Sequence, residues 1–245
     1  TLANAGTFDI SANGASIKDL SGAGGVTLGA QTLTITEATS TYSGVMSGTG
    51  NLTVSGGTLI LTNSNTYEGL TTISGSAKLQ LSNNGSNNGS ISSSRQIINN
   101  SFSGTFQTDV ATSVKDLWGN GNVVLNAILT ITDATPDGIP HEISGAISGA
   151  GGLTLTGGLM TLSGSNGYTG GTTINSGCTL YLTSSGSIGE SNTLACNGTF
   201  NFSATSGCSL KDLSGSGSVV LGSNILTLTA STSTFTGVIS NVPGG

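Results

Sequence analysis

The sequence predicts an all-β solenoid, a parallel β-helix in which successive turns of the chain stack on equivalent turns. Three observations predict this fold: a long internal repeat, a shorter repeat inside it, and short segments in which apolar and polar residues alternate. Clusters of Gly, Ser and Asn separate these segments and supply the conformations that corners require. No window shows the 3.6-residue apolar period of a helix, so the whole chain is expected to form strands.

The composition supports a folded protein and excludes several classes of function. Of 245 residues, 35% are hydrophobic and only 7% are charged, and the mean hydropathy is +0.17, so the high charge typical of disorder is missing. A net charge of −6 with five Lys and Arg argues against binding to nucleic acid or to anionic lipid. No apolar run is long enough for a membrane-spanning helix, and the first residues lack the features of a signal peptide.

The long repeat is marked by two tripeptides, Gly-Thr-Phe and Lys-Asp-Leu, which occur in that order three times. The lysines of the second tripeptide, Lys18, Lys115 and Lys211, are 97 and 96 residues apart. The chain therefore holds about two and a half copies of one unit. We expect a single β-helical domain with its sub-repeats at 5–102, 103–196 and, in part, 197–245.

A shorter repeat inside the long one gives the predicted length of a turn. Alternating segments that begin at Thr7, Thr32 and Thr58 start 25 and 26 residues apart. Two or three short strands with their corners fill about 25 residues, which predicts about ten turns, about four per long repeat, and a rod of about 48 Å. Parity places these residues inside: Phe8, Ile10, Leu33, Ile35, Leu52, Val54, Leu59, Leu61, Leu79, Leu81, Leu129, Ile131, Leu153, Leu155, Leu180 and Leu182.

One stretch carries a fixed order of glycines, an aromatic residue and two Thr-rich strands. It runs through Ile147-Ser148-Gly149-Ala150-Gly151-Gly152-Leu153, Thr161-Leu162-Ser163-Gly164-Ser165-Asn166 and Tyr168-Thr169-Gly170-Gly171-Thr172-Thr173-Ile174. This stretch resembles the autotransporter-associated β-strand repeat, found in passenger regions of secreted proteins of Gram-negative bacteria. The resemblance implies a right-handed parallel β-helix, secreted or displayed at the cell surface. It also implies a fragment of a longer protein, anchored in the outer membrane through a region outside it.

The candidate site is an irregular stretch around the only histidine. Relative to the other two copies, this stretch is about five residues longer and holds two of the three prolines, so we expect a protruding loop. Its members Asp133, Asp137, His141 and Glu142 could bind a cation, but they lack a known ligand spacing, and a plain surface loop is the favoured interpretation. No cofactor, metal site or catalytic residue is predicted.

Other features have simpler interpretations. The Lys-Asp pairs are interpreted as solvated turns rather than charged spots along one side, and the Asn-rich segment 83–89 as a wide corner rather than an adhesive protrusion. The three cysteines are interpreted as small buried residues, with one disulfide left open. The aromatic-x-Gly sites are interpreted as corners in which the ring covers the core: Tyr42, Tyr67, Tyr168 and Phe235.

These features predict a structural and adhesive stalk segment that self-associates side by side or binds a host or abiotic surface, without catalysis of its own. A repeat unit of an extracellular filament is the alternative. A polysaccharide-acting enzyme is less favoured, because the eleven acidic residues are scattered. Ice binding is also less favoured. The Thr rows at 32, 34 and 36, at 130 and 132, and at 227 and 229 would have to recur in every turn, and Asp9, Ile60 and Gln107 are expected to interrupt them.

Overall fold

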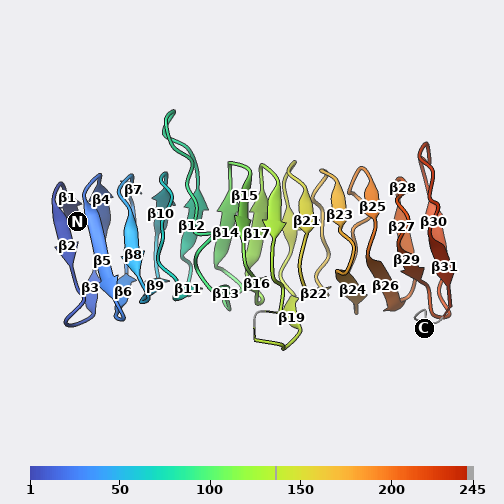
Figure 1. The fold of residues 1–245 in the computed structure, drawn as a ribbon, viewed down its shortest axis with the longest axis horizontal. Helices are drawn as coiled ribbons and strands as arrows, with labels where there is room; N and C mark the ends of the chain where they lie inside the picture. Colours follow the sequence, from blue (N-terminus) through green and yellow to red (C-terminus); the bar gives the residue numbers. More distant parts are fainter. Residues whose placement is uncertain (136, 242–245) are drawn as a thin grey trace.

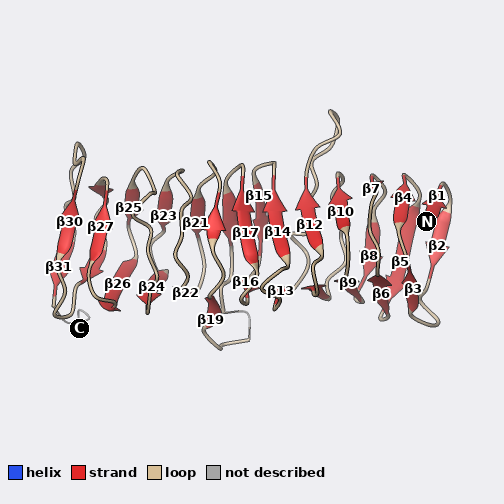
Figure 2. Cartoon of the chain, turned by 180° about the vertical axis from the view of Figure 1, so that it is seen from behind, coloured by secondary structure: helices blue, strands red, loops and turns tan. Residues whose placement is uncertain are grey.

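The computed structural model describes residues 1–135 and 137–241, which form an elongated parallel β-solenoid (Figures 1 and 2). No helix occurs in these two ranges. Every pairing between named strands is parallel, so each strand lies beside strands of the preceding and following turns. The predicted all-β parallel solenoid is confirmed.

Each complete turn passes along three sides of the solenoid, and the sheets of each side continue one another. The first side consists of β1 (Leu2–Asn4), β4 (Leu20–Gly22), β7 (Thr41–Tyr42), β10 (Thr58–Leu61), β12 (Lys78–Leu81), β14 (Thr105–Thr108), β17 (Asn122–Leu125), β20 (Ile147–Ser148), β27 (Cys208–Leu210) and β30 (Leu226–Leu228).

The second side follows the first in each turn. It consists of β2 (Thr7–Asp9), β5 (Gly25–Gly29), β8 (Met46–Gly48), β15 (Thr112–Val114), β18 (Leu129–Ile131), β21 (Leu153–Leu155), β23 (Thr172–Ile174), β25 (Leu194–Cys196) and β28 (Leu213–Ser214).

The third side completes each turn, and the bridge between Gly119 and Ile143 joins its two sheets. It consists of β3 (Ala15–Ile17), β6 (Thr32–Ile35), β9 (Asn51–Val54), β11 (Leu70–Ile73), β13 (Gln96–Asn99), β16 (Leu117–Trp118), β19 (His141–Ile143), β22 (Leu159–Leu162), β24 (Thr179–Thr183), β26 (Thr199–Ala204), β29 (Ser218–Val220) and β31 (Val238–Ser240).

The length of a turn differs from the prediction. The solenoid has about 13 turns with about 19 residues in each, rather than ten turns of 25. Leu33 pairs with Leu52 of the next turn and not with Leu59, which lies on the first side. The reason is that all strands share one alternating pattern. A step of 25 residues covers one turn and one further side, so it links similar strands that do not stack.

The same geometry places the long repeats. Leu20, Leu117 and Leu213 of the three Lys-Asp-Leu tripeptides begin β4, β16 and β28, which lie on the first, third and second sides. A long repeat therefore ends one side away from where it began. The three lysines lie at three different corners, and the idea of charged spots about four turns apart along one side is wrong.

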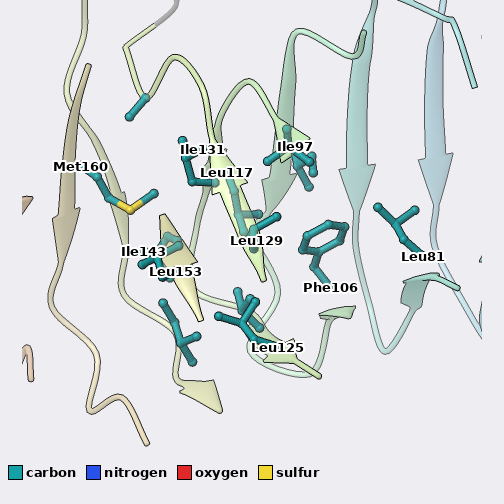
Figure 3. Packing of buried hydrophobic residues seen from close by; sticks show 14 of the residues in the cluster. Leu81, Ile97, Phe106, Leu117, Leu125, Leu129, Ile131, Ile143, Leu153 and Met160 are labelled. Atoms are coloured by element: carbon teal, nitrogen blue, oxygen red, sulfur yellow. The ribbon is translucent and has the colours of Figure 1, made fainter. Parts of the chain in front are cut away.

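The core is a continuous column of apolar side chains (Figure 3). Of the sixteen side chains predicted to lie inside, fifteen are buried, whereas Phe8 is half-buried against the same core. The buried positions were predictable although the length of a turn was not. In a strand, alternate residues face the core, and this does not depend on which strand of the next turn lies above it. The buried aliphatic side chains contribute about 1.5–3 kcal/mol each.

Tyrosines close three corners of this core, as predicted. Tyr42, Tyr67 and Tyr168 are fully buried. The Tyr42 hydroxyl donates to the carbonyl oxygen of Gly24 at 2.6 Å, while Tyr67 and Tyr168 bond to the hydroxyls of Thr71 and Thr172 at 2.6 and 2.7 Å. Burial raises the pKa of Tyr42 to about 12. Phe235, the fourth predicted corner, is only half-buried.

Two segments depart from the regular turns (Figure 1). One, between β12 and β13, projects as a finger in which Asn83 and Asn88 form an antiparallel bridge and Gly85 has a φ of 87°. This stretch is a protruding hairpin and not the wide corner expected. The other lies between β18 and β19 and includes the predicted protruding loop.

Candidate functional site at the second Lys-Asp-Leu turn

The only histidine joins the β18–β19 loop to the neighbouring turn. His141 begins β19, and Asp116 lies directly before β16 of the preceding turn. The Nδ1 atom of His141 is 2.5 Å from Oδ2 of Asp116, and its Nε2 atom is 3.5 Å from Oδ2 of Asp137. A single imidazole thus lies between two carboxylates from different parts of the chain.

Neighbouring side chains hold this cluster in place. The indole of Trp118 stacks on the His141 ring, with the centroids 5.0 Å apart and the planes 19° from parallel. Gln96 of β13 donates from Nε2 to Oδ2 of Asp137 at 3.2 Å, and the backbone N–H of Ile139 donates to Oδ1 of Asp137 at 3.1 Å. Asp116 is buried, His141 is mostly buried, and Asp137 is partly exposed. We call Gln96, Asp116, Trp118, Asp137 and His141 the histidine cluster.

The equivalent aspartates of the other two copies have different partners. Asp19 accepts hydrogen bonds from the Thr39 N–H and from the hydroxyls of Thr39 and Ser40, at 2.6 to 3.0 Å. Asp212 accepts the same set from Thr232 and Ser233, together with the backbone N–H of Ser233.

The structural register shows that these three turns are equivalent. Gly22 pairs with Tyr42, Gly119 with Ile143 and Gly215 with Phe235. His141 therefore stands in the place of Ser40 and Ser233. It is 25 residues from its aspartate, whereas each serine is 21 residues from its own, so the longer loop of the second copy brings in a histidine where the others present hydroxyls.

These partners shift the carboxyl pKa values in opposite directions. At Asp19 burial acts to raise the pKa, but the hydrogen bonds outweigh it and hold the pKa at about 2. Hydrogen bonds, first of all from the Ser233 hydroxyl, likewise lower the pKa of Asp212 to about 2. Burial raises the pKa of Asp116 to about 6, only partly offset by the His141 hydrogen bond and charge. The Oδ1 atom of Asp116 and the Nε1 atom of Trp118 are buried without a hydrogen-bond partner among the described residues.

The predicted loop residues divide into two groups. Asp137 and His141 belong to the histidine cluster, whereas Glu142 is exposed and accepts a hydrogen bond from the Ser163 hydroxyl. Asp133 is exposed, and its carboxylate has no partner within the described residues. Within residues 1–135 and 137–241, no group of three His, Cys, Asp or Glu side chains is arranged to hold a metal ion.

Gln96, Asp116 and Trp118, the other members of the cluster, were not predicted from the sequence. The aspartates of all three Lys-Asp pairs are buried, so the interpretation of these turns as solvated is wrong for the carboxylates. A signal was available: Trp118, the only tryptophan, stands where the equivalent tripeptides are followed by Ser21 and Ser214. Gln96 comes from a strand far away in sequence and had no such signal.

The remaining candidates are structural. Cys178, Cys196 and Cys208 are free and buried, as expected for small core residues, and burial raises the pKa of Cys196 to about 11. Two shallow hollows of about 440 and 380 Å³ lie on either side of the exposed Ile128. Their linings are Gly, Ala, Ser, Thr and Asn with Ile128 and hold no titratable side chain.

No protein-family model matches the chain, and no curated protein or solved structure is significantly similar to it. The structure contains no helix, within the described residues, of the length and apolarity that a membrane span requires.

Proposed function

We propose that the chain is a structural and adhesive stalk segment of a secreted or surface-displayed, autotransporter-like bacterial protein. It has no catalysis of its own, and it associates side by side with further copies or with a host or abiotic surface. We also propose that the β-solenoid winds in the right-handed sense. The observation that carries it is the continuous apolar column, which links about 13 turns into one rod of roughly 60 Å.

The outer surface supports the adhesive part of this proposal. On the third side, Thr34, Thr53 and Thr72 are aligned in successive turns. On the second side, Thr130, Thr154 and Thr173 form an equivalent ladder. Rows of hydroxyls on a parallel sheet offer many weak hydrogen bonds, and a low charge density leaves little repulsion between copies.

Both ladders are short, which disfavours ice binding. The third-side ladder ends at Ser16 in one direction and at Ile98 in the other. Ile60 and Gln107, two of the interruptions expected from the sequence, lie on the first side. Asp9, the third, lies on the second side but pairs with Thr27 and does not stack on Thr130, Thr154 or Thr173. The threonine ladders are therefore interrupted, but by residues other than those expected from the sequence.

Sedimentation over a wide range of protein concentrations tests the proposal. We expect the average mass to rise with concentration, and a strictly monomeric protein at the highest concentration would contradict side-by-side association. The double variant Thr34→Lys, Thr53→Lys tests whether the copies associate through the third-side ladder. Ala12→Lys with Asn13→Lys is the control, because it adds the same charge at an exposed corner.

A further inference from the structure

The histidine cluster is placed to respond to pH, because the one histidine of the protein lies between two carboxylates. Histidine changes charge between about pH 5 and 8. Neutral imidazole has one N–H, whereas imidazolium has two. In this structure each ring nitrogen of His141 faces a different carboxylate, Asp116 at Nδ1 and Asp137 at Nε2.

We propose that Asp116, His141 and Asp137 form a proton-dependent clasp that fastens the loop segment 137–140 to the side of the rod. When His141 carries both protons, it is hydrogen-bonded to Asp116, and its charge attracts Asp137 across the 3.5 Å contact, which joins the loop to the preceding turn. When it loses one proton, this charge attraction ends, and Asp137 keeps only the hydrogen bonds from Gln96 and from the Ile139 N–H. Asp137 is the carboxylate whose attachment weakens, because its contact with His141 is the longer one and its side chain is the more exposed.

Among the described residues, the carboxylates of Asp116 and Asp137 are the charged groups that face His141. Trp118 covers one face of the ring, and Met160 pairs with His141 in the next turn. Gln96, from β13, is neutral. The neighbouring charges are directed elsewhere: Lys115 donates to the carbonyl oxygen of Ser93, and Glu142 accepts from Ser163.

The other two copies lack this device, which makes them internal controls. Their aspartates are held by hydroxyl and amide donors of Thr39, Ser40, Thr232 and Ser233, none of which titrates near neutral pH. Only the second copy combines a longer loop, a histidine and a stacked tryptophan.

The protein contains one tryptophan and one histidine, so tryptophan fluorescence reports directly on the clasp. A stacked imidazolium quenches indole emission, and we expect a single sigmoidal rise in wild-type emission as the pH increases from 5 to 8. In His141→Ser, which installs the residue of the other copies, this transition should vanish. In Asp137→Asn, which removes only the exposed carboxylate, it should remain but move to lower pH.

Hydrogen exchange tests the mechanical part of the proposal. The Ile139 N–H donates to Asp137, so its protection, after correction for intrinsic rates, should fall by about tenfold across the transition, as the loop loses the charge contact between Asp137 and His141 and opens more often. The Thr39 and Thr232 amides should show no such change. The clasp is overturned by flat wild-type emission, by an unchanged transition in either variant, or by Ile139 protection that does not follow the fluorescence.

Discussion

The Asp19 turn and the Asp116 turn occupy the same place in the long repeat, but the chain satisfies their carboxylates in different ways. At Asp19, hydroxyl and amide donors surround the charge, and the pKa is lowered to about 2. At Asp116, one imidazole is the side-chain partner, one carboxylate oxygen has no partner among the described residues, and burial raises the pKa to about 6. A repeat can therefore keep its backbone and core while a longer loop changes the chemistry of one corner.

The comparison depends on a common core under both turns, and breaking that core should have the largest effect. Leu153 is buried in β21 and stacks between Leu129 and Thr172. Leu153→Asp leaves a charge in a dry column and should cost more than about 4 kcal/mol of unfolding free energy. Thr154→Asp, the outward neighbour, is the control and should cost less than about 1 kcal/mol. Equal urea midpoints for the two variants would refute the assigned faces.

Removing each carboxylate should lower the free energy of unfolding by an intermediate amount, and this amount should differ between the two turns. Asp19→Ala leaves several donors of Thr39 and Ser40 without a partner and should cost about 2 kcal/mol. Asp116→Ala removes a carboxylate that is poorly satisfied, so we expect less than half that loss. Urea denaturation at pH 7 measures both, and an equal or greater loss for Asp116→Ala would break the contrast.

The two turns should also respond to pH in opposite directions. The pKa of Asp19 falls from 3.8 to about 2 on folding, so its stabilisation is present above pH 3.8 and is lost as the pH falls towards 2. The pKa of Asp116 rises from 3.8 to about 6, so its contribution is most favourable below pH 3.8 and declines as the pH rises through 6. Carboxyl NMR titration of both residues measures this, and parallel titrations would contradict it.

The lysines of the turns should matter least. Lys18 forms a pair with Glu37 at 3.1 Å, and both side chains are largely exposed. An exposed pair of this kind contributes little, so Lys18→Ala should change the unfolding free energy by at most about 0.5 kcal/mol. A loss as large as that of Asp19→Ala would show that the charge pair, and not the buried carboxylate, stabilises the corner.

The sequence was sufficient for the fold class and for the buried faces, because both follow from local alternation. The inward side chains of β6 and β9 were identified without knowing that they stack on each other. The length of a turn was not predictable in the same way. Every strand carries a similar pattern, so a step of four strands resembles a step of three, and only the pairing of Leu33 with Leu52 decides between them.

The histidine cluster was predicted only in part. The loop and two of its residues, Asp137 and His141, stood out as departures from the repeat. Their partners did not, because Asp116 belongs to a tripeptide that recurs in all three copies, and its burial depends on which turn covers it. Gln96 is 41 residues from Asp137 in the chain, a contact set entirely by the stacking of turns.

Paired cysteines test the central claim, the stacking of turns of about 19 residues, most directly. In a background where the three native cysteines are replaced by alanine, Thr34→Cys with Thr53→Cys places two thiols on directly paired residues of the third side. Neighbouring strands are about 4.8 Å apart, which a disulfide can span. We expect rapid oxidation of this pair and none for Thr34→Cys with Ile60→Cys, which a 25-residue turn would stack. The reverse result would contradict the structure.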